Sequence, residues 1–273
     1  MQNVITDVEE IPTDAQHFAL FSGGNDSIAS THYVHEHNEI DYTVYLDTNT
    51  GIPENKEYVK DVCNEYGWDL AILSSPVTLK EFATGTETRQ PLGFPGPGVH
   101  SWAFQYFKER QLGQIATRTE PEPRFYTGVR TAESDKRMQN IDESREQAER
   151  WVWVNPICEW SDSEVDDYRE KHDLPENPVN QKINRSGDCY CGAYANRSTE
   201  LVELEAHFPE HYEWLMNVEE EVQAELGTEQ PSSYWGFGNM DERELRAEIA
   251  KNDDAQMMLC SSCDVPDYPT DGE

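Results

Sequence analysis

The feature that most limits what this chain can fold into is the run "FALFSGGNDSIAS", residues 18 to 30. Its apolar start predicts a short buried strand, and the residues after the two glycines are compatible with a helix. A strand that passes through glycines into a helix places backbone N–H groups at the carboxyl edge of a sheet, where they bind anions. Glycine has no Cβ, so the backbone can approach a phosphate closely. The run therefore predicts a phosphate-binding turn.

Three side chains of this run add chemistry to the turn. Ser22 and Ser27 can donate hydroxyl hydrogen bonds, and Asp26 can hold Mg²⁺ or cap the helix. The Walker A pattern G-x-x-x-x-G-K-[ST] is absent, so the chain does not have a P-loop of that kind. Taken alone, the run is equally consistent with a plain glycine turn that carries an Asp cap.

Strands and helices alternate along the first half of the chain. Apolar runs predict strands at 17–21, 42–48, 69–73 and 124–129, and helical spacing predicts helices at 27–37, 54–67 and 101–112. This alternation predicts an α/β fold, with a parallel sheet covered by helices on both faces. We expect this nucleotide-binding α/β domain to span residues 1–150.

After Trp151 the pattern becomes mainly helical. Ser161 and Glu164 predict a capping box at the start of a helix over 161–172, and a longer helical stretch over 198–226 is interrupted near Pro209. We expect residues 151–273 to form a helical, cysteine-containing region packed on the first domain.

The charge of the chain is strongly acidic. The 54 Asp and Glu residues outnumber 21 Lys and Arg residues, which gives a formal net charge of -33. Such a charge opposes non-specific binding to nucleic acid. It also keeps a protein soluble in molar salt, where the screening length is about 3 Å, and we interpret it as a sign of a halophile or its virus. No signal peptide and no run of about 20 apolar residues is present, so we expect a cytoplasmic protein without membrane contact.

The cysteines are unevenly placed. Cys63 lies in a helical pattern and is expected to be a small buried core residue. Two close pairs follow in the second half, Cys189-x-Cys191 and Cys260-x-x-Cys263, with Cys158 as a reserve ligand. In a reducing cytosol close pairs are more often metal ligands than disulfides. We predict that the two pairs share one centre, either tetrahedral Zn²⁺ or a [4Fe-4S] cluster.

Several segments resemble a known family. "SGGNDS" resembles the pyrophosphate loop of the PP-loop ATP pyrophosphatases. "YLDTNTGIPENKEYVKDVCNEYGWDLAIL" and "NPICEWSDSEVDDYREKHDLPENPV" are similar to segments of the phosphoadenosine phosphosulfate (PAPS) reductase family, and "YTGVRTAESDKR" matches its substrate-binding stretch. The C-terminal part, with "SGDCYCGAY" and "CSSC", resembles a branch of that family common in phages and mobile elements.

The resemblance implies a sheet of the adenine nucleotide alpha-hydrolase type and a site for ATP or for an adenosine phosphosulfate (PAPS or APS), with Mg²⁺. The implied nucleotide-binding residues are Ser22, Gly23, Gly24, Asp26, Ser27, Asp47, Gly128, Arg130 and Arg137. Of these, Asp26, Ser27 and Arg130 are the expected catalytic residues. Sulfur-transfer relatives often hold a [4Fe-4S] cluster, so the resemblance favours iron over zinc at the cysteines.

The chain also departs from the family pattern. The reductases carry a catalytic Cys in a Glu-Cys-Gly-Leu-His setting, and the iron-sulfur type has an adjacent Cys-Cys pair; this sequence has neither. Asn25 replaces the frequent Lys after Gly-Gly, so Mg²⁺, Arg130 or Arg137 must neutralise the phosphate charge.

Three functions fit these observations. The first is an enzyme that activates an acceptor by adenylation with pyrophosphate release, after which the acceptor, a nucleic acid or a protein, receives sulfur. The second is a sulfonucleotide reductase, and the third is a non-catalytic nucleotide-binding module of a DNA-modification or defence system. A homodimer is possible in each case.

Other conspicuous side chains are given smaller roles. His100 is a candidate nucleotide contact, His32 and His35 are expected on a helix surface, and the tryptophans Trp151, Trp153 and Trp160 are expected in the core.

Overall fold

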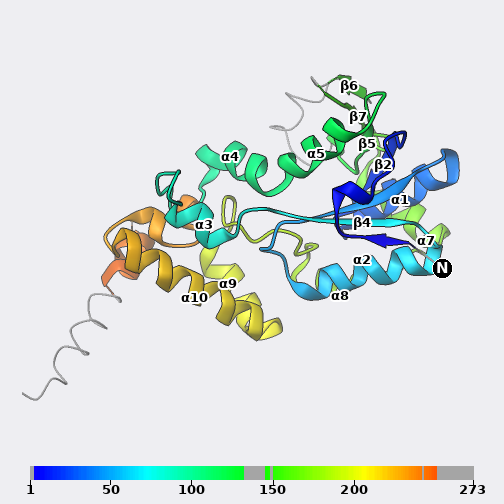
Figure 1. Ribbon diagram of the computed structural model, residues 1–273. Helices are drawn as coiled ribbons and strands as arrows, with labels where there is room; N and C mark the ends of the chain where they lie inside the picture. Colours follow the sequence, from blue (N-terminus) through cyan, green and yellow to red (C-terminus); the bar gives the residue numbers. More distant parts are fainter. Residues whose placement is uncertain (1–2, 132–144, 148–149, 242, 251–273) are drawn as a thin grey trace, which may run out of the picture.

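The computed structural model describes residues 3–131, 145–147, 150–241 and 243–250. Figure 1 shows a twisted sheet flanked by helices, and a second group of helices to one side of it. The strands are β1 (Val4–Ile5), β2 (His17–Leu20), β3 (Tyr42–Asp47), β4 (Leu70–Ser74), β5 (Arg124–Tyr126), β6 (Arg145–Gln147) and β7 (Val152–Val154). The helices are α1 (Asn25–His37), α2 (Pro53–Tyr66), α3 (Leu79–Thr84), α4 (His100–Phe104), α5 (Arg110–Arg118), α7 (Asp162–Lys171), α8 (Pro178–Ile183), α9 (Arg197–His207) and α10 (Pro209–Leu226).

The strands of the described residues form one sheet in the order β1-β4-β3-β2-β5-β7-β6. Every neighbouring pair is parallel except β6 and β7, which are antiparallel at the edge. The strand order reverses direction at β2, because β3 and β4 lie on one side of it and β5 and β7 on the other. Ligands of open α/β sheets bind at such a switch point, outside the carboxyl ends of the strands.

Each face of the sheet has its own core. On one face Phe18, Val44 and Phe125 pack with Leu112 and Ile115 of α5. The opposite core contains side chains of α1 and α2, among them Ile28, Val59 and Cys63, packed with residues of β3 and β4. The alternation of side chains along each strand explains why one strand can supply both cores. The predicted α/β fold with helices on both faces is confirmed.

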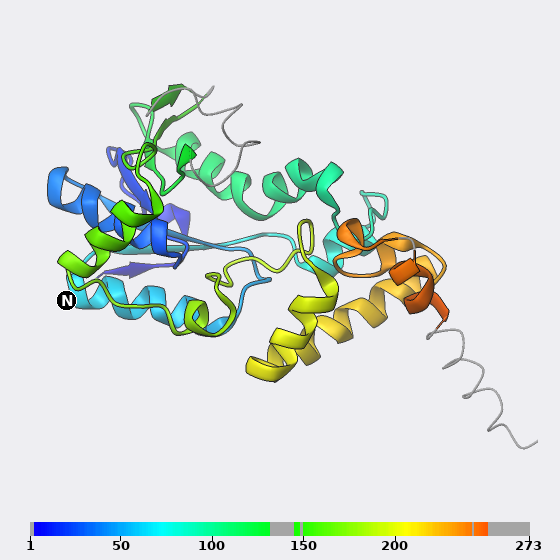
Figure 2. The same ribbon diagram turned by 180° about the vertical axis from the view of Figure 1, so that it is seen from behind.

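A third core joins the helices that follow the sheet. Leu204 of α9, Leu215 of α10 and the fully buried Trp235 pack with Phe82 of α3 and Phe107. Figures 1 and 2 both show α9 and α10 beside α3, at a distance from the edge strand β1. The helical C-terminal part is confirmed, whereas the division at residue 150 stays a prediction; β7, just beyond that point, belongs to the sheet.

Most predicted elements are present, with three differences. The first helix begins at Asn25 instead of Ser27, so it follows the glycines directly. The helix expected over 101–112 is divided, because residues Gln105–Glu109 form a π-helical turn between α4 and α5. His32 is buried, not on the surface as expected, and its ring lies 4.9 Å from that of His172.

Two predicted helix signals have the expected geometry. Ser161 and Glu164 form a capping box at α7, and Gly67 ends α2 in the left-handed conformation. None of the helices in the described part of the chain combines the length and apolarity that a membrane span requires.

Candidate functional site

The turn between β2 and α1 is the starting point of the site. Gly23 has φ +86°, and a Cβ at this position would lie 2.1 Å from Asn55 Oδ1, so only glycine fits. Gly24 is the N-cap residue of α1, and no side chain caps the helix. The first N–H groups of an α-helix have no partner within the helix and carry its positive dipole end. This turn therefore has the properties of an anion site.

Two buried asparagines orient the turn. Asn55 Nδ2 donates to Ser22 O at 3.0 Å, and Asn177 Nδ2 donates to Gly23 O at 2.7 Å. Because a trans peptide places C=O and N–H on opposite sides, the N–H groups of Gly23 and Gly24 are directed away from the asparagines. The two amides thus fix the turn with its donors available to a ligand.

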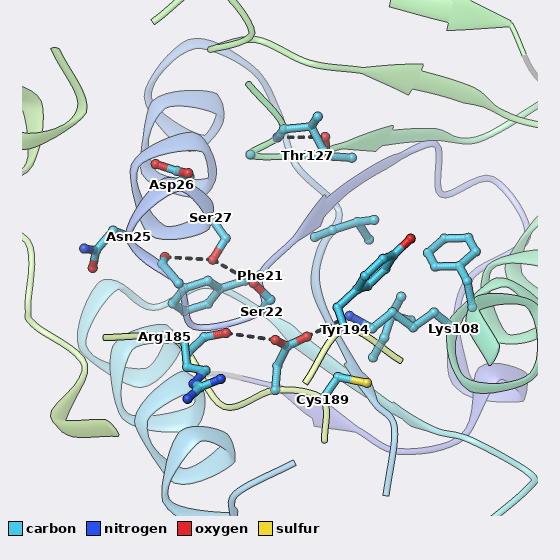
Figure 3. Close-up of a pocket in the computed structure, with 18 of the residues that line it drawn as sticks. Phe21, Ser22, Asn25, Asp26, Ser27, Lys108, Thr127, Arg185, Cys189 and Tyr194 are labelled. Atoms are coloured by element: carbon cyan, nitrogen blue, oxygen red, sulfur yellow. Dashed lines mark hydrogen bonds and ion pairs between the residues drawn. The ribbon is translucent and has the colours of Figure 1, made fainter. Parts of the chain in front are cut away.

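A large cavity opens in front of this turn. Its volume is about 1310 Å³, above the roughly 300–1,000 Å³ that is usual for a single small ligand. Figure 3 shows Ser22, Asn25, Asp26 and Ser27 at one end and Lys108, Cys189 and Tyr194 at the other. Between the ends the wall is apolar and comes from the sheet and α5, with Leu20, Leu46, Leu112 and Trp153.

The hydroxyls of the turn form a short chain at its end of the cavity. Ser22 Oγ donates to Ser27 Oγ at 3.2 Å, and Ser27 Oγ donates to Gly24 O at 2.9 Å (Figure 3). Gly128 closes the turn from the β5 side, since a Cβ there would lie 2.7 Å from Asp26 O. Gly23 is not among the lining residues of the cavity. Six other predicted nucleotide-binding residues line it together: Ser22, Gly24, Asp26, Ser27, Gly128 and Arg130.

Arg130 is held at the same place by two carboxylates. Its Nε lies 3.0 Å from Asp26 Oδ1, and its Nη2 lies 2.8 Å from Asp162 Oδ1. Its Nη1 also donates to Trp160 O at 3.1 Å. Burial alone would lower the pKa of Arg130. The hydrogen bonds and charges of Asp26 and Asp162 outweigh burial, so the pKa is raised. Asp26 thus pairs with Arg130 and does not cap α1.

Lys108 and Asp188 form an ion pair at the other end. Lys108 Nζ lies 2.7 Å from Asp188 Oδ2, and about a quarter of the lysine side chain is exposed. Burial would lower the pKa of Lys108, but the charges of Asp188 and Cys189 outweigh burial and raise it. Burial would likewise raise the pKa of Asp188, and Lys108 holds it below its usual value. Both groups are therefore charged at neutral pH.

Cys189 and Cys191 lie beside this pair. A hydrogen bond from the Cys191 side chain lowers the pKa of Cys189 to about 6, and the charge of Lys108 acts in the same direction. The same contact raises the pKa of Cys191 well above its usual value. Cys189 is partly exposed and Cys191 is buried, yet both line the cavity. The contact therefore favours the thiolate at Cys189 and the thiol at Cys191.

The cations of the cavity wall are all paired. Lys108, Arg130 and Arg185 are its basic residues, and Arg185 pairs with Glu200 at 2.6 Å and with Glu203. Five carboxylates line the same wall, Asp26, Asp162, Asp166, Asp188 and Glu200, which leaves an excess of two negative charges over the three cations. An anionic ligand would need an added cation or an exchange of ion-pair partners here.

The remaining predicted residues have different outcomes. His100 lines the cavity, with its ring 4.7 Å from that of Tyr194. Asp47 is not among the lining residues, because its carboxylate binds Lys56 Nζ at 2.9 Å and accepts from Asn49 N at 3.0 Å. Arg137 lies outside the described residues, so its predicted role is not tested.

The predicted metal centre is only half described. Cys260 and Cys263 lie outside the described residues. Among those that are described, no group of three or more His, Cys, Asp or Glu side chains is placed to hold a metal ion, so Cys158 does not complete a site with Cys189 and Cys191. The shared centre therefore stays a prediction. It rests on the contact between Cys189 and Cys191 and on two cysteines that lie outside the described residues.

Sequence reasoning missed Lys108, Asp188 and the clamp residues Asn55 and Asn177. Lys108 had a signal, because it stands four residues after Phe104 and four before Leu112 on a helix face that is otherwise apolar. Asn55 and Asn177 lie in segments that resemble the family, but no local pattern indicates their partners, which are backbone carbonyls far away in the sequence.

Comparisons with known proteins identify the family of this chain. The family model of the phosphoadenosine phosphosulfate reductase domain matches residues 16–194. This match spans more than half of the chain, so the protein belongs to the PAPS reductase family. No match was found among curated proteins.

Two solved structures show a more distant likeness. Phosphoadenylyl-sulfate reductase from Candida auris, in a phosphate complex, is 17% identical with a TM-score of 0.44, over 64% of this chain and 79% of that chain. The U34-tRNA thiolase NcsA from Methanococcus maripaludis, with its [4Fe-4S] cluster, is 16% identical with a TM-score of 0.42, over 77% and 73%. Likeness at this level does not assign roles to individual residues.

Proposed function

We propose that this protein binds an adenine nucleotide, ATP or an adenosine phosphosulfate, and uses it in sulfur transfer. The observation that carries the proposal is a single cavity with the uncapped N-terminus of α1 at one end and two cysteines at the other. Phosphates suit the first end and sulfur chemistry suits the second.

The adenosine has a matching wall between the two ends. The partly exposed side chains of Leu20, Leu46 and Trp153 form an apolar surface that suits a planar base. The phosphates would then lie against Ser22, Gly24 and Ser27. The wall carries excess negative charge, so we expect Mg²⁺ to accompany the nucleotide, with Asp26 as the residue that would hold it. When bound, Mg²⁺ neutralises phosphate charge.

With ATP the reaction is adenylation of an acceptor. An acceptor oxygen attacks the α-phosphorus, the bond from that phosphorus to the bridging oxygen breaks, and pyrophosphate leaves with the electron pair. The N–H groups of the turn stabilise the charge that develops on the leaving group. Sulfide then displaces AMP from the acceptor, which we propose to be a nucleic acid or a protein. A persulfide in place of sulfide would leave a disulfide on the acceptor, which an external thiol would then cleave.

A second candidate function is favoured by the position of Cys189 in the cavity. With an adenosine phosphosulfate, the Cys189 thiolate would attack the sulfate sulfur, the sulfur–oxygen bond to phosphate would break, and the adenosine phosphate would leave. The thiosulfonate on Cys189 would then release sulfite when Cys191 attacks the Cys189 sulfur, and an external dithiol would reduce the resulting disulfide. The missing Glu-Cys-Gly-Leu-His cysteine makes Cys189 the alternative nucleophile.

The test separates these functions by nucleotide and by product. Calorimetric titration with Mg-ATP and with PAPS measures binding, and pyrophosphate or sulfite release measures turnover. We expect Asp26→Asn to weaken Mg-nucleotide binding at least about tenfold, because one ligand of the cation is lost. Asp166→Asn is the matched control, since Asp166 lines the same cavity but lies on α7 and pairs with Arg169.

Each outcome decides between the candidates. Pyrophosphate release with ATP supports adenylation, and sulfite release with PAPS supports reduction. Binding without either product supports the non-catalytic module. If neither nucleotide bound to the full-length protein, or if both variants bound as well as the wild type, the proposed nucleotide site would be wrong.

A further inference from the structure

The segment that carries Cys189 and Cys191 is fixed at the residue between them. Tyr190 N donates to Thr50 Oγ1 at 2.9 Å, and Trp235 Nε1 donates to Tyr190 O at 2.7 Å. Both backbone groups of Tyr190 are thus held, and its side chain is buried against Trp235. This anchoring fixes the segment in which the side chains of Cys189 and Cys191 contact each other.

The two sulfurs differ in access. Cys189 is partly exposed in the cavity, and Thr50 Oγ1 donates to its Sγ at 3.6 Å. Cys191 is 8% exposed, and its side chain forms a hydrogen bond with that of Cys189. A reagent in the cavity therefore reaches Cys189 first, and Cys191 is placed to attack whatever forms there.

We propose that Cys189 and Cys191 are a thiol–disulfide couple, in which Cys189 is the attacking sulfur and Cys191 the resolving sulfur. The couple would give the cavity its own supply of two electrons. Its use in catalysis rests on the proposed function, because the reductase reaction leaves a sulfonate group on Cys189 that a second thiol must release. The formation of the disulfide itself needs no nucleotide.

The exchange balances with a disulfide as the oxidant. The Cys189 thiolate attacks one sulfur of an external disulfide, whose S–S bond breaks, and one thiolate leaves. The Cys191 thiol loses its proton to solvent and attacks the Cys189 sulfur, which releases the second thiolate and forms the Cys189–Cys191 bond. Two protein thiols are oxidised, one external disulfide is reduced, and the two departing thiolates take up the protons.

Other cysteines of the described chain are poor partners for this chemistry. Cys63 is fully buried in the core between the sheet and α2, and burial raises its pKa to about 12. Cys158 is buried and its pKa is raised by burial as well. Neither lines the cavity. We therefore expect an external disulfide to react at Cys189 in preference to Cys63 and Cys158, even when all four described cysteines are reduced.

The test uses the full-length chain with Cys260→Ser and Cys263→Ser, so that the second pair cannot contribute. After incubation with glutathione disulfide, we expect a mass loss of two hydrogens and a single disulfide-linked peptide pair, Cys189 with Cys191. Adding Cys191→Ser should trap one glutathione on Cys189. Adding Cys189→Ser instead should slow glutathione incorporation at least about tenfold relative to the Cys191→Ser variant. Adding Cys158→Ser should change neither the disulfide nor its rate of formation.

Three results would overturn the proposal. They are the absence of a Cys189–Cys191 disulfide under these conditions, equal trapping of glutathione on Cys191 in the Cys189→Ser variant, and a stoichiometric metal in anaerobically purified wild-type protein that protects both thiols. Nucleotide binding is measured separately on the reduced protein. Loss of binding with a normal disulfide would contradict the proposed function alone, and normal binding without a disulfide would contradict the couple alone.

Discussion

The two ends of the cavity are built in different ways. The phosphate end is one continuous segment, β2, the Ser22–Gly24 turn and the start of α1, held from behind by two asparagines. The cysteine end is assembled from Thr50, Lys108 and the segment around Tyr190, which are far apart in the sequence. The first end depends on backbone conformation and the second on tertiary packing. A change of one residue should therefore damage them in different ways.

The largest effect is expected at the phosphate end. Gly23→Ala should lower the free energy of unfolding by about 3 kcal/mol, because alanine is strained at φ +86° and its Cβ would overlap Asn55 Oδ1. Nucleotide binding should be lost with it. Chemical denaturation measures the first effect, and Gly98→Ala is the control, since a Cβ there meets nothing within 4 Å. Equal stability of the two variants would show that the turn does not need its left-handed residue.

A smaller loss of stability, but a local one, is expected at the cysteine end. Lys108→Met leaves Asp188 without its partner and should cost about 2 kcal/mol, since the pair is only partly exposed. It should also slow alkylation of Cys189 at neutral pH, because the charge of Lys108 helps to lower the pKa of that thiol. Iodoacetamide kinetics followed by peptide mapping measure the rate.

Lys56→Met is the matched control for this prediction. Lys56 pairs with Asp47 away from the cavity, so its loss should leave Cys189 alkylation unchanged. Equal slowing in both variants would mean that the effect of Lys108 is not local.

The next effect is a loss of stability in acid, which one histidine in α1 and one in α10 should cause. Burial lowers the pKa of His211 in α10 to about 4, and burial lowers that of His35 in α1 to about 4 as well. The unfolded chain binds these protons at higher pH, near the ordinary value of 6.5, so stability is full above about 6.5 and falls toward pH 4. Each histidine should contribute up to about 1.4 kcal/mol per pH unit in that window.

His211→Gln removes only the contribution of the C-terminal helices. The free energy of unfolding is measured between pH 6.5 and 4.5. Its slope against pH should be smaller than in the wild type by up to about 1.4 kcal/mol per pH unit, which corresponds to one proton. An unchanged slope would indicate that His211 is already protonated in the folded protein.

The smallest effect concerns salt. Binding of an anionic nucleotide to a chain of net charge -33 is opposed by long-range repulsion, which salt screens. Raising KCl from about 0.1 M to about 1 M shortens the screening length from about 10 Å to about 3 Å, so affinity should rise by a few fold. Calorimetry at the two salt concentrations tests this, and a marked fall would point to an exposed cationic site.

The same difference explains what the sequence could predict. Ser22 to Ser27 are neighbours along the chain, so their composition alone indicated the strand, the turn and the helix that follows. The capping box at Ser161 and the stop at Gly67 are local in the same sense. Such signals depend on backbone preferences that each residue carries with it.

The cysteine end required contacts that no local pattern encodes. The pairing of Lys108 with Asp188 joins residues 80 positions apart, and the anchoring of Tyr190 by Trp235 joins residues 45 positions apart. Asp47 shows the opposite case, because the family resemblance predicted a residue of the nucleotide site that does not line the cavity. Its carboxylate instead pairs with Lys56 and accepts a hydrogen bond from Asn49 N. The division of the 101–112 helix by a π turn was also invisible, because its hydrophobic pattern continues through the break.

The size of the cavity has a consequence for the order of events. A volume of about 1310 Å³ exceeds what one nucleotide needs, so a second reactant can enter before the first product leaves. For the adenylation candidate, a reaction run in this way is sequential, and double-reciprocal plots at several fixed concentrations of the second reactant should intersect. Parallel lines would instead mean that the first product departs before the second reactant arrives.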